Sequence, residues 1–195
     1  MRRSIEIALT SVMGSLAILT TISGAYRFLA FPLAPYLKFD PAEIIDVLAY
    51  FIGGSKIGFL AATIHFLGLL MFTGDPLGST MKFLAVTSML IGIHLSKVKG
   101  YNRLALYLLA STSRILVMTV VNAYVLYFLF PDFLTFFDDY ASAVGLSGEI
   151  GLLSVALIIT SIYNLLHVPF TLIPSELAYK AISSSISFRF PESRG

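Results

Sequence analysis

The sequence contains no cysteine and few charged residues, and each deficit excludes a class of protein. Without cysteine the chain has no disulfide framework, no thiolate metal site and no thiol chemistry. Charged residues make up 12% of the 195 residues, against roughly 25% in soluble domains, and hydrophobic residues make up 57%. A net charge of +2 and a sparse polar surface argue against a nucleic-acid partner. The chain is therefore predicted to be an integral membrane protein.

Motifs of catalysis and of nucleotide hydrolysis are also missing. No Gly-Lys dipeptide occurs, so the chain has no Walker-type phosphate loop and cannot hydrolyse ATP by itself. Neither a His-Glu-x-x-His motif nor a Gly-x-Ser-x-Gly elbow is present. His65, His94 and His167 lie in three different apolar segments, and we expect no carboxylate at the depth of His65 or His167. The sequence thus predicts no catalytic residue, no metal site and no cofactor, and the chain is not expected to be an enzyme.

Six apolar segments follow one another with no soluble domain between them. They cover residues 4–25, 42–54, 56–73, 80–96, 103–130 and 150–182. The first follows a basic start like that of a signal peptide, but it is about as long as a spanning helix of roughly 20 residues, and we interpret it as retained. The second is too short to cross roughly 30 Å of hydrocarbon, so we expect it to be tilted or partly buried. The prediction is an all-α membrane protein, a six-transmembrane-helix bundle forming a single domain over 1–195.

The distribution of basic residues predicts the orientation of this bundle. With both termini inside, the cytoplasmic side carries Arg2, Arg3, Lys56, Lys97, Lys99, Arg103, Lys180, Arg189 and Arg194, and the outer side carries only Arg27, Lys38 and Lys82. The positive-inside rule selects this topology, with cytoplasmic N- and C-termini. The outer side is predicted to be acidic, with Asp40, Glu43, Asp46, Asp75, Asp132, Asp138, Asp139 and Glu149. Its aromatic loops, 26–41 and 131–149, either anchor the chain in the interface or cover a cavity.

Two of the apolar segments carry polar side chains at helical spacing. Arg114 and Asn122 are eight residues apart and share a helix face, with Arg114 about 15 Å from the inner end and near the midplane. A guanidinium at that depth needs partners inside the bundle, and we expect a structural cation bonded to an acid or to helix-end carbonyls, with direct ligand contact as the alternative. In the last segment Asn164 and His167 are predicted to face a ligand, the alternative being interhelical hydrogen bonds.

Small residues form two further stripes, which allow another helix to approach closely. Gly54, Gly58 and Ala62 recur every four residues, and we expect them to pack inside the bundle. The first segment carries the second stripe at spacings of four, three and four, and it is either a packing face or an outward docking face for another membrane subunit. Its members are Ser4, Ala8, Ser11 and Ser15.

Four stretches occur in this order along the chain: LKFDPAEI (37–44), GGSKIGFLAATIHFL (53–67), RILVMTVVNAYVL (114–126) and YNLLH (163–167). Together they resemble the substrate-binding S component of energy-coupling-factor (ECF) vitamin transporters, of the riboflavin-binding RibU type. The resemblance implies a multi-pass protein of the plasma membrane that captures a vitamin from outside. It also implies a membrane coupling subunit and two ATPase subunits as partners. In this family small residues of the first helix form the docking surface, which fits the stripe that begins at Ser4.

The resemblance also nominates substrate-binding residues. Carried over position by position, they are Leu37, Lys38, Asp40, Asn122 and Asn164. Two further expected positions depart from the family pattern: Lys82 ends GSTMK (78–82), where the family has Gly-Glu-x-x-Asn, and His167 stands where the family has lysine. The substrate is therefore riboflavin, a flavin derivative or another vitamin.

A neutral, flat ligand such as riboflavin requires an apolar slot with a few placed polar groups and no counter-charge. If Arg114 reached the pocket, a phosphorylated flavin would be favoured instead. Two readings outside vitamin binding remain open: a six-helix membrane scaffold of the MreD kind, which would have no high-affinity ligand, and an intramembrane enzyme that uses His65 or His167.

Overall fold

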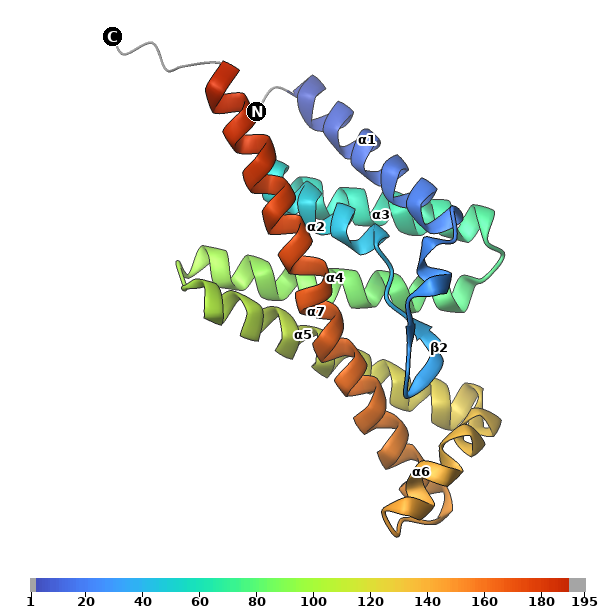
Figure 1. Cartoon of the computed structure of the whole chain (residues 1–195). Helices are drawn as coiled ribbons and strands as arrows, with labels where there is room; N and C mark the ends of the chain where they lie inside the picture. The colour runs from blue at the N-terminus through green and yellow to red at the C-terminus, as the bar shows by residue number, and fades with distance from the viewer. Residues whose placement is uncertain (1–2, 190–195) are drawn as a thin grey trace.

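The computed structural model describes residues 3–189, which are almost entirely helical (Figure 1). The helices are α1 (Arg3–Ile22), α2 (Ala42–Gly53), α3 (Ser55–Phe72), α4 (Pro76–Val98), α5 (Arg103–Tyr124), α6 (Asp138–Ala143) and α7 (Gly148–Arg189). Two short strands, β1 (Ala30–Phe31) and β2 (Ala34–Lys38), form an antiparallel hairpin. Turns of 3-10 helix span Ala25–Phe28 and Pro131–Phe137, and a π turn over Val125–Leu129 prolongs α5.

Five helices in the described part of the chain are long and apolar enough to cross a membrane: α1, α3, α4, α5 with its π turn, and α7. The remaining predicted segment, 42–54, corresponds to α2, whose 12 residues reach only about 18 Å. At 42 residues, α7 is about 63 Å long and exceeds the thickness of a bilayer. The six predicted segments thus correspond to six helices, and the predicted all-α membrane fold is confirmed.

The short helix α2 is embedded in the bundle rather than placed at its edge. It packs against α1, α3 and α7. The Ser175 hydroxyl of α7 donates a hydrogen bond of 2.9 Å to the backbone oxygen of Ile44 in α2. Since neighbouring helices surround it, polar residues of α2 can be kept away from lipid although the helix does not span the bilayer.

Glycine permits the closest helix contacts. A Cβ added to Gly92 of α4 would lie 2.4 Å from the backbone oxygen of Leu109 in α5. A Cβ on Gly58 of α3 would lie 2.6 Å from the Cβ of Tyr50 in α2. Gly58 and Ala62 are buried, as expected of a packing stripe, whereas Gly54 is exposed and forms the α2–α3 turn with a φ of 82°.

The two ends of the bundle differ in structure. The beginning of α1 and the end of α7 lie at the same end of the molecule, at the top of Figure 1. Exposed ion pairs join Glu6, near the beginning of α1, to Lys56 at 2.7 Å, and Arg103, at the beginning of α5, to Glu176. At the opposite end, Phe31 of the hairpin packs in a cluster with Leu126, Phe137 and Ile159. The predicted outer loops are therefore folded onto the bundle and onto each other.

Candidate ligand-binding site

A cavity of about 590 Å³ lies between the hairpin, α4, α5 and α7. Its apolar lining includes Leu77, Met81, Ala85, Met118, Val125, Leu126, Phe130 and Phe133. Its polar lining includes Lys38, Asp40, Glu43, Asp75, Lys82, Arg114, Asn122, Thr160, Tyr163 and Asn164. The surface of the cavity is mostly apolar even though many of its lining residues carry polar groups, and this size and surface are typical of a site for a small organic molecule.

The two loops predicted to be aromatic meet at this cavity. Tyr36 of β2 and Phe133 of the 3-10 turn both line it, and their ring centroids are 5.3 Å apart in an edge-on contact. Burial raises the pKa of the Tyr36 phenol to about 12, so the ring is uncharged at physiological pH. The loops thus enclose one side of the cavity, as the cavity-covering alternative expects.

The structure brings six of the seven expected substrate-binding residues to the cavity wall. They are Leu37, Lys38, Asp40, Lys82, Asn122 and Asn164. Within residues 3–189 the Asn122 side chain has no hydrogen-bond partner although only 6% of the residue is exposed. An amide that is buried from solvent but open to a cavity is available to a ligand.

His167 is the expected residue that the structure does not bring to the cavity. It is fully buried behind Tyr163, whose hydroxyl lies 2.9 Å from His167 Nδ1. Its ring also packs on Phe39, with 5.3 Å between the ring centroids. Tyr163 itself lines the cavity and donates a hydrogen bond of 2.7 Å to the backbone oxygen of Lys38. His167 therefore supports the wall rather than forming part of it.

An ion pair closes the deep end of the cavity. The Arg114 guanidinium donates to both carboxylate oxygens of Glu43, with Nη1–Oε2 at 2.5 Å and Nη2–Oε1 at 3.3 Å. Arg114 Nε donates to Asn164 Oδ1 at 3.0 Å, and Asn164 Nδ2 donates to the backbone oxygen of Thr160 at 2.8 Å. The expected pairing of Arg114 with an acid is confirmed, and the paired guanidinium also lines the cavity.

The positions of Glu43, Asp46 and Asp40 correct part of the prediction of an acidic outer surface. All three are buried, and Asp46 has no exposed surface. Glu43 and Asp46 are three residues apart on α2 and therefore share the helix face that is turned into the bundle. The prediction was wrong for these three because it treated the first turns of a short apolar segment as exposed, whereas neighbouring helices cover α2. The other five acids of the predicted outer side are exposed: Asp75, Asp132, Asp138, Asp139 and Glu149.

The same burial overturns the expectation that His65 and His167 lack a neighbouring carboxylate. His65 Nδ1 lies 2.8 Å from Asp46 Oδ2, and His167 Nε2 lies 3.3 Å from Glu43 Oε2. The sequence contained a signal for this arrangement: two acids three residues apart in a segment too short to span the bilayer. Such acids are retained in a membrane only where cationic or hydrogen-bonding partners meet them.

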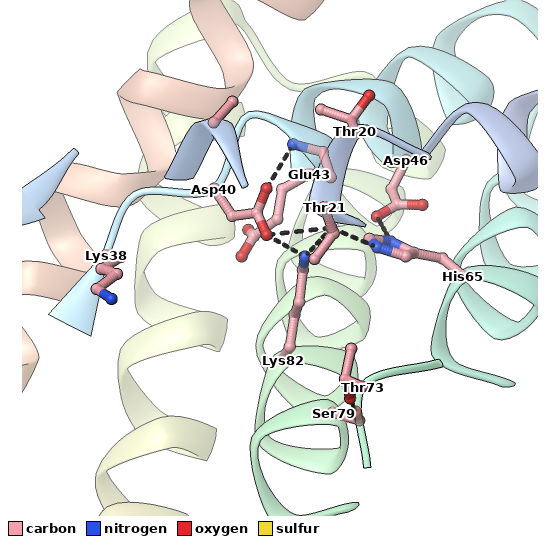
Figure 2. Close-up of polar contacts among 12 residues, drawn as sticks. Thr20, Thr21, Lys38, Asp40, Glu43, Asp46, His65, Thr73, Ser79 and Lys82 are labelled. Atoms are coloured by element: carbon pink, nitrogen blue, oxygen red, sulfur yellow. Dashed lines mark hydrogen bonds and ion pairs between the residues drawn. The ribbon is translucent and has the colours of Figure 1, made fainter. Parts of the chain in front are cut away.

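Lys82 and Asp40 form a second ion pair on the cavity wall (Figure 2). The other two charged residues of the lining also have partners: Lys38 lies 5.5 Å above the ring of Tyr26, and Asp75 caps α4 by accepting from Gly78 N at 2.8 Å. The lining contains three acidic and three basic side chains, so its formal charge is zero. A charge-balanced cavity suits an uncharged ligand.

The four small residues of the first stripe, in contrast, have no partner helix. Ser4, Ala8, Ser11 and Ser15 are all exposed on α1, whose other face packs on α2 and α3. The structure thus excludes the packing alternative for these residues within the described chain and leaves an outward face of small residues.

The arrangement of the helices defines a class of protein. The chain is similar in fold to a solved S component of a bacterial ECF transporter, with a TM-score of 0.65, 21% sequence identity, and coverage of 95% of this chain and 99% of that one. No protein-family model matches the sequence. The fold is therefore that of an ECF S component.

A sequence relative makes the comparison more specific. The riboflavin transporter RibU of Staphylococcus aureus (strain TCH60) is 27% identical over 132 residues, which cover 64% of this chain and 70% of that protein. The resemblance to the S components of ECF transporters, of the riboflavin type, is confirmed by these two findings. Both relatives are transport proteins by their descriptions, and the five membrane-spanning candidates in the described part of this chain agree with the expectation of a multi-pass membrane protein.

Proposed function

We propose that the chain is the riboflavin-binding S component of an ECF importer, with both termini in the cytoplasm. Riboflavin is then its cargo and not a cofactor. A coupling subunit carrying two ATPases would deliver the cargo, since the chain has no phosphate loop of its own. The fold of the bundle and the similarity to a riboflavin transporter support this proposal.

The observation that carries the proposal is the charge-balanced, largely apolar cavity. Riboflavin is neutral, its tricyclic ring is flat, and its pyrimidine edge and ribityl chain provide hydrogen-bond donors and acceptors. Met118 and Leu126 offer apolar surface to the ring. One N–H of Asn164 and the whole amide of Asn122 are free to recognise polar edges. A scaffold without a ligand would have no use for a cavity lined in this way.

The exposed stripe on α1 supports the docking part of the proposal. Small side chains let a second helix approach until the backbones touch. In a membrane, where the hydrophobic effect does not drive helices together, this close packing drives their association. Ala8 and Ser11 lie at the centre of this face. We propose that the coupling subunit binds here.

Replacing Asn164 by alanine is expected to weaken riboflavin binding at least tenfold, or about 1.4 kcal/mol. The substitution removes the free amide N–H and the oxygen that orients Arg114. Quenching of riboflavin fluorescence by purified protein in detergent measures the affinity. Ser161→Ala is the matched control, because Ser161 bonds Thr119 of α5 at 3.2 Å away from the cavity and should leave binding unchanged. Wild-type affinity in Asn164→Ala would remove Asn164 from the site.

Flavin mononucleotide is expected to bind at least tenfold more weakly than riboflavin. Its phosphate brings negative charge to a cavity whose two deep cations, Arg114 and Lys82, are already paired with Glu43 and Asp40. The same titration with both flavins measures the ratio. Equal or tighter binding of the phosphate ester would show that a cation of the cavity leaves its acid for the ligand.

A further inference from the structure

A chain of buried polar contacts leads away from the cavity through the first four helices (Figure 2). Lys82 of α4 pairs with Asp40 and also donates to the Thr21 hydroxyl of α1 at 2.7 Å. Thr21 Oγ1 lies 3.0 Å from His65 Nε2 of α3, and His65 Nδ1 lies 2.8 Å from Asp46 Oδ2 of α2. Lys82 and Asp40 line the cavity, whereas Thr21 and His65 do not.

One assignment of donors and acceptors satisfies the hydrogen bonds that link Asp46, His65, Thr21 and Lys82. If the Asp46 carboxylate accepts the Nδ1–H of a neutral His65 ring, Nε2 is left as an acceptor. The Thr21 hydroxyl then donates to Nε2, and its oxygen lone pairs face the Lys82 ammonium. Asp40 Oδ2, 3.2 Å from Thr21 Oγ1, is a second acceptor within reach of the same hydroxyl. Whichever of the two accepts the hydrogen, the hydroxyl leaves its oxygen lone pairs for the Lys82 ammonium and so favours a cation at that position.

This orientation matters because the lysine side chain is flexible. An ammonium on four methylene groups has many rotamers and is held in place only by its acceptors. Asp40 is one acceptor of Lys82, and Thr21 is the other within the described residues. Asp40 is in turn fixed on its other oxygen, which accepts from Ala42 N at 2.8 Å.

Asp46 has a feature that packing alone does not explain. It is completely buried, and its Oδ1 has no hydrogen-bond partner among the described residues. A buried carboxylate with an unpaired oxygen is costly. Within residues 3–189 its one side-chain hydrogen bond is to His65, so we infer that it orients the His65 ring.

We propose that Thr21, His65 and Asp46 are positioning residues that hold Lys82 and Asp40 in the geometry required for ligand recognition. This inference rests on the proposed ligand-binding function of the cavity. None of the three touches the ligand. Each acts through the residue to which it is hydrogen-bonded. Supporting groups of this kind decide whether a binding group is held in its productive position.

The first test is ligand affinity in purified variants. Thr21→Val removes the hydroxyl at nearly constant volume and is expected to weaken riboflavin binding at least tenfold, whereas Thr21→Ser restores binding to within threefold. His65→Leu should weaken binding similarly. His94→Leu is the matched control: His94 bonds the Tyr50 hydroxyl at 3.2 Å and belongs to no part of the cavity. Wild-type affinity in Thr21→Val and His65→Leu would overturn the proposal.

A double-variant comparison separates positioning from general loss of structure. If Thr21 acts through Lys82, the variant Thr21→Val/Lys82→Met binds no more weakly than Lys82→Met alone. Effects that multiply, with thermal unfolding unchanged, would show that Thr21 acts independently of Lys82 and would contradict its role in holding Lys82.

A third readout does not depend on the ligand. The rate at which an acetylating reagent modifies Lys82, followed by mass spectrometry, is expected to rise at least tenfold in Thr21→Val and in His65→Leu but not in His94→Leu. An unchanged rate would overturn the positioning role. If the wild-type protein binds no riboflavin, the proposed function fails. The acetylation rate still decides whether Thr21 and His65 hold Lys82 in place.

Discussion

Replacing Glu43 by leucine is expected to destabilise the folded protein by about 3–5 kcal/mol, because it leaves Arg114 as an uncompensated buried cation. Among the described residues, the Asn164 oxygen is then the hydrogen-bond partner that Arg114 keeps, and one neutral amide does not replace a carboxylate as the partner of a buried guanidinium. Denaturation by a strong detergent, followed by circular dichroism, measures the change in the free energy of unfolding.

Two further variants establish that the loss belongs to the buried pair. The double variant Glu43→Leu/Arg114→Met removes both charges and should recover most of the stability, since buried ion pairs exchange for apolar side chains at little cost. Glu6→Leu breaks the exposed pair with Lys56 and should leave stability nearly unchanged. A double variant as unstable as Glu43→Leu would mean that lost packing, and not the unpaired cation, accounts for the effect.

The second large effect is expected on uptake rather than on binding. Ala8→Leu and Ser11→Leu place branched side chains in the exposed small-residue face of α1 and should abolish riboflavin uptake by whole cells. Purified protein should retain its affinity, because α1 contributes no residue of the stripe to the cavity. Uptake of labelled riboflavin in cells that depend on this protein is the measurement.

A matched control is available on another exposed helix face. Ser154 of α7 is also an exposed serine whose hydroxyl bonds its own helix at 2.8 Å, so Ser154→Leu makes the same chemical change away from α1. It should leave uptake intact. Normal uptake in Ala8→Leu and Ser11→Leu would refute the docking surface, and loss of uptake in Ser154→Leu would show that any added bulk on the exterior is harmful.

The six helices could be predicted from the sequence because apolar runs and polar boundaries determine them locally. Residues 42–54, for example, correspond to α2 (Ala42–Gly53). The helix ends where the next residue, Gly54, adopts a φ of 82°. The prediction that Arg114 and Asn122 share one helix face was also correct, because both line the cavity and their spacing is a local property of the sequence. Helical spacing requires no knowledge of neighbouring helices.

The partners of these residues could not be predicted in the same way. Glu43 and Arg114 are 71 residues apart, and Thr21 and His65 are 44 apart, so their contacts depend on how helices pack. The residue that lies beside His167 depends on how deep α2 is in the bundle, which the sequence does not reveal. If α2 were an outer segment, no residue of α2 would cover His167, and the histidine could face a ligand. Once α2 is inside the bundle, Glu43 fills that space and His167 lies behind the wall.

The central claim is that the cavity binds riboflavin, and the visible absorbance spectrum of the protein tests it most directly. Protein purified in detergent from cells that supply riboflavin is expected to carry an oxidised-flavin band that survives washing, and Asn164→Ala should reduce that band. A colourless protein that also fails to quench the fluorescence of added riboflavin would contradict the account and would leave the S-component fold with a different ligand.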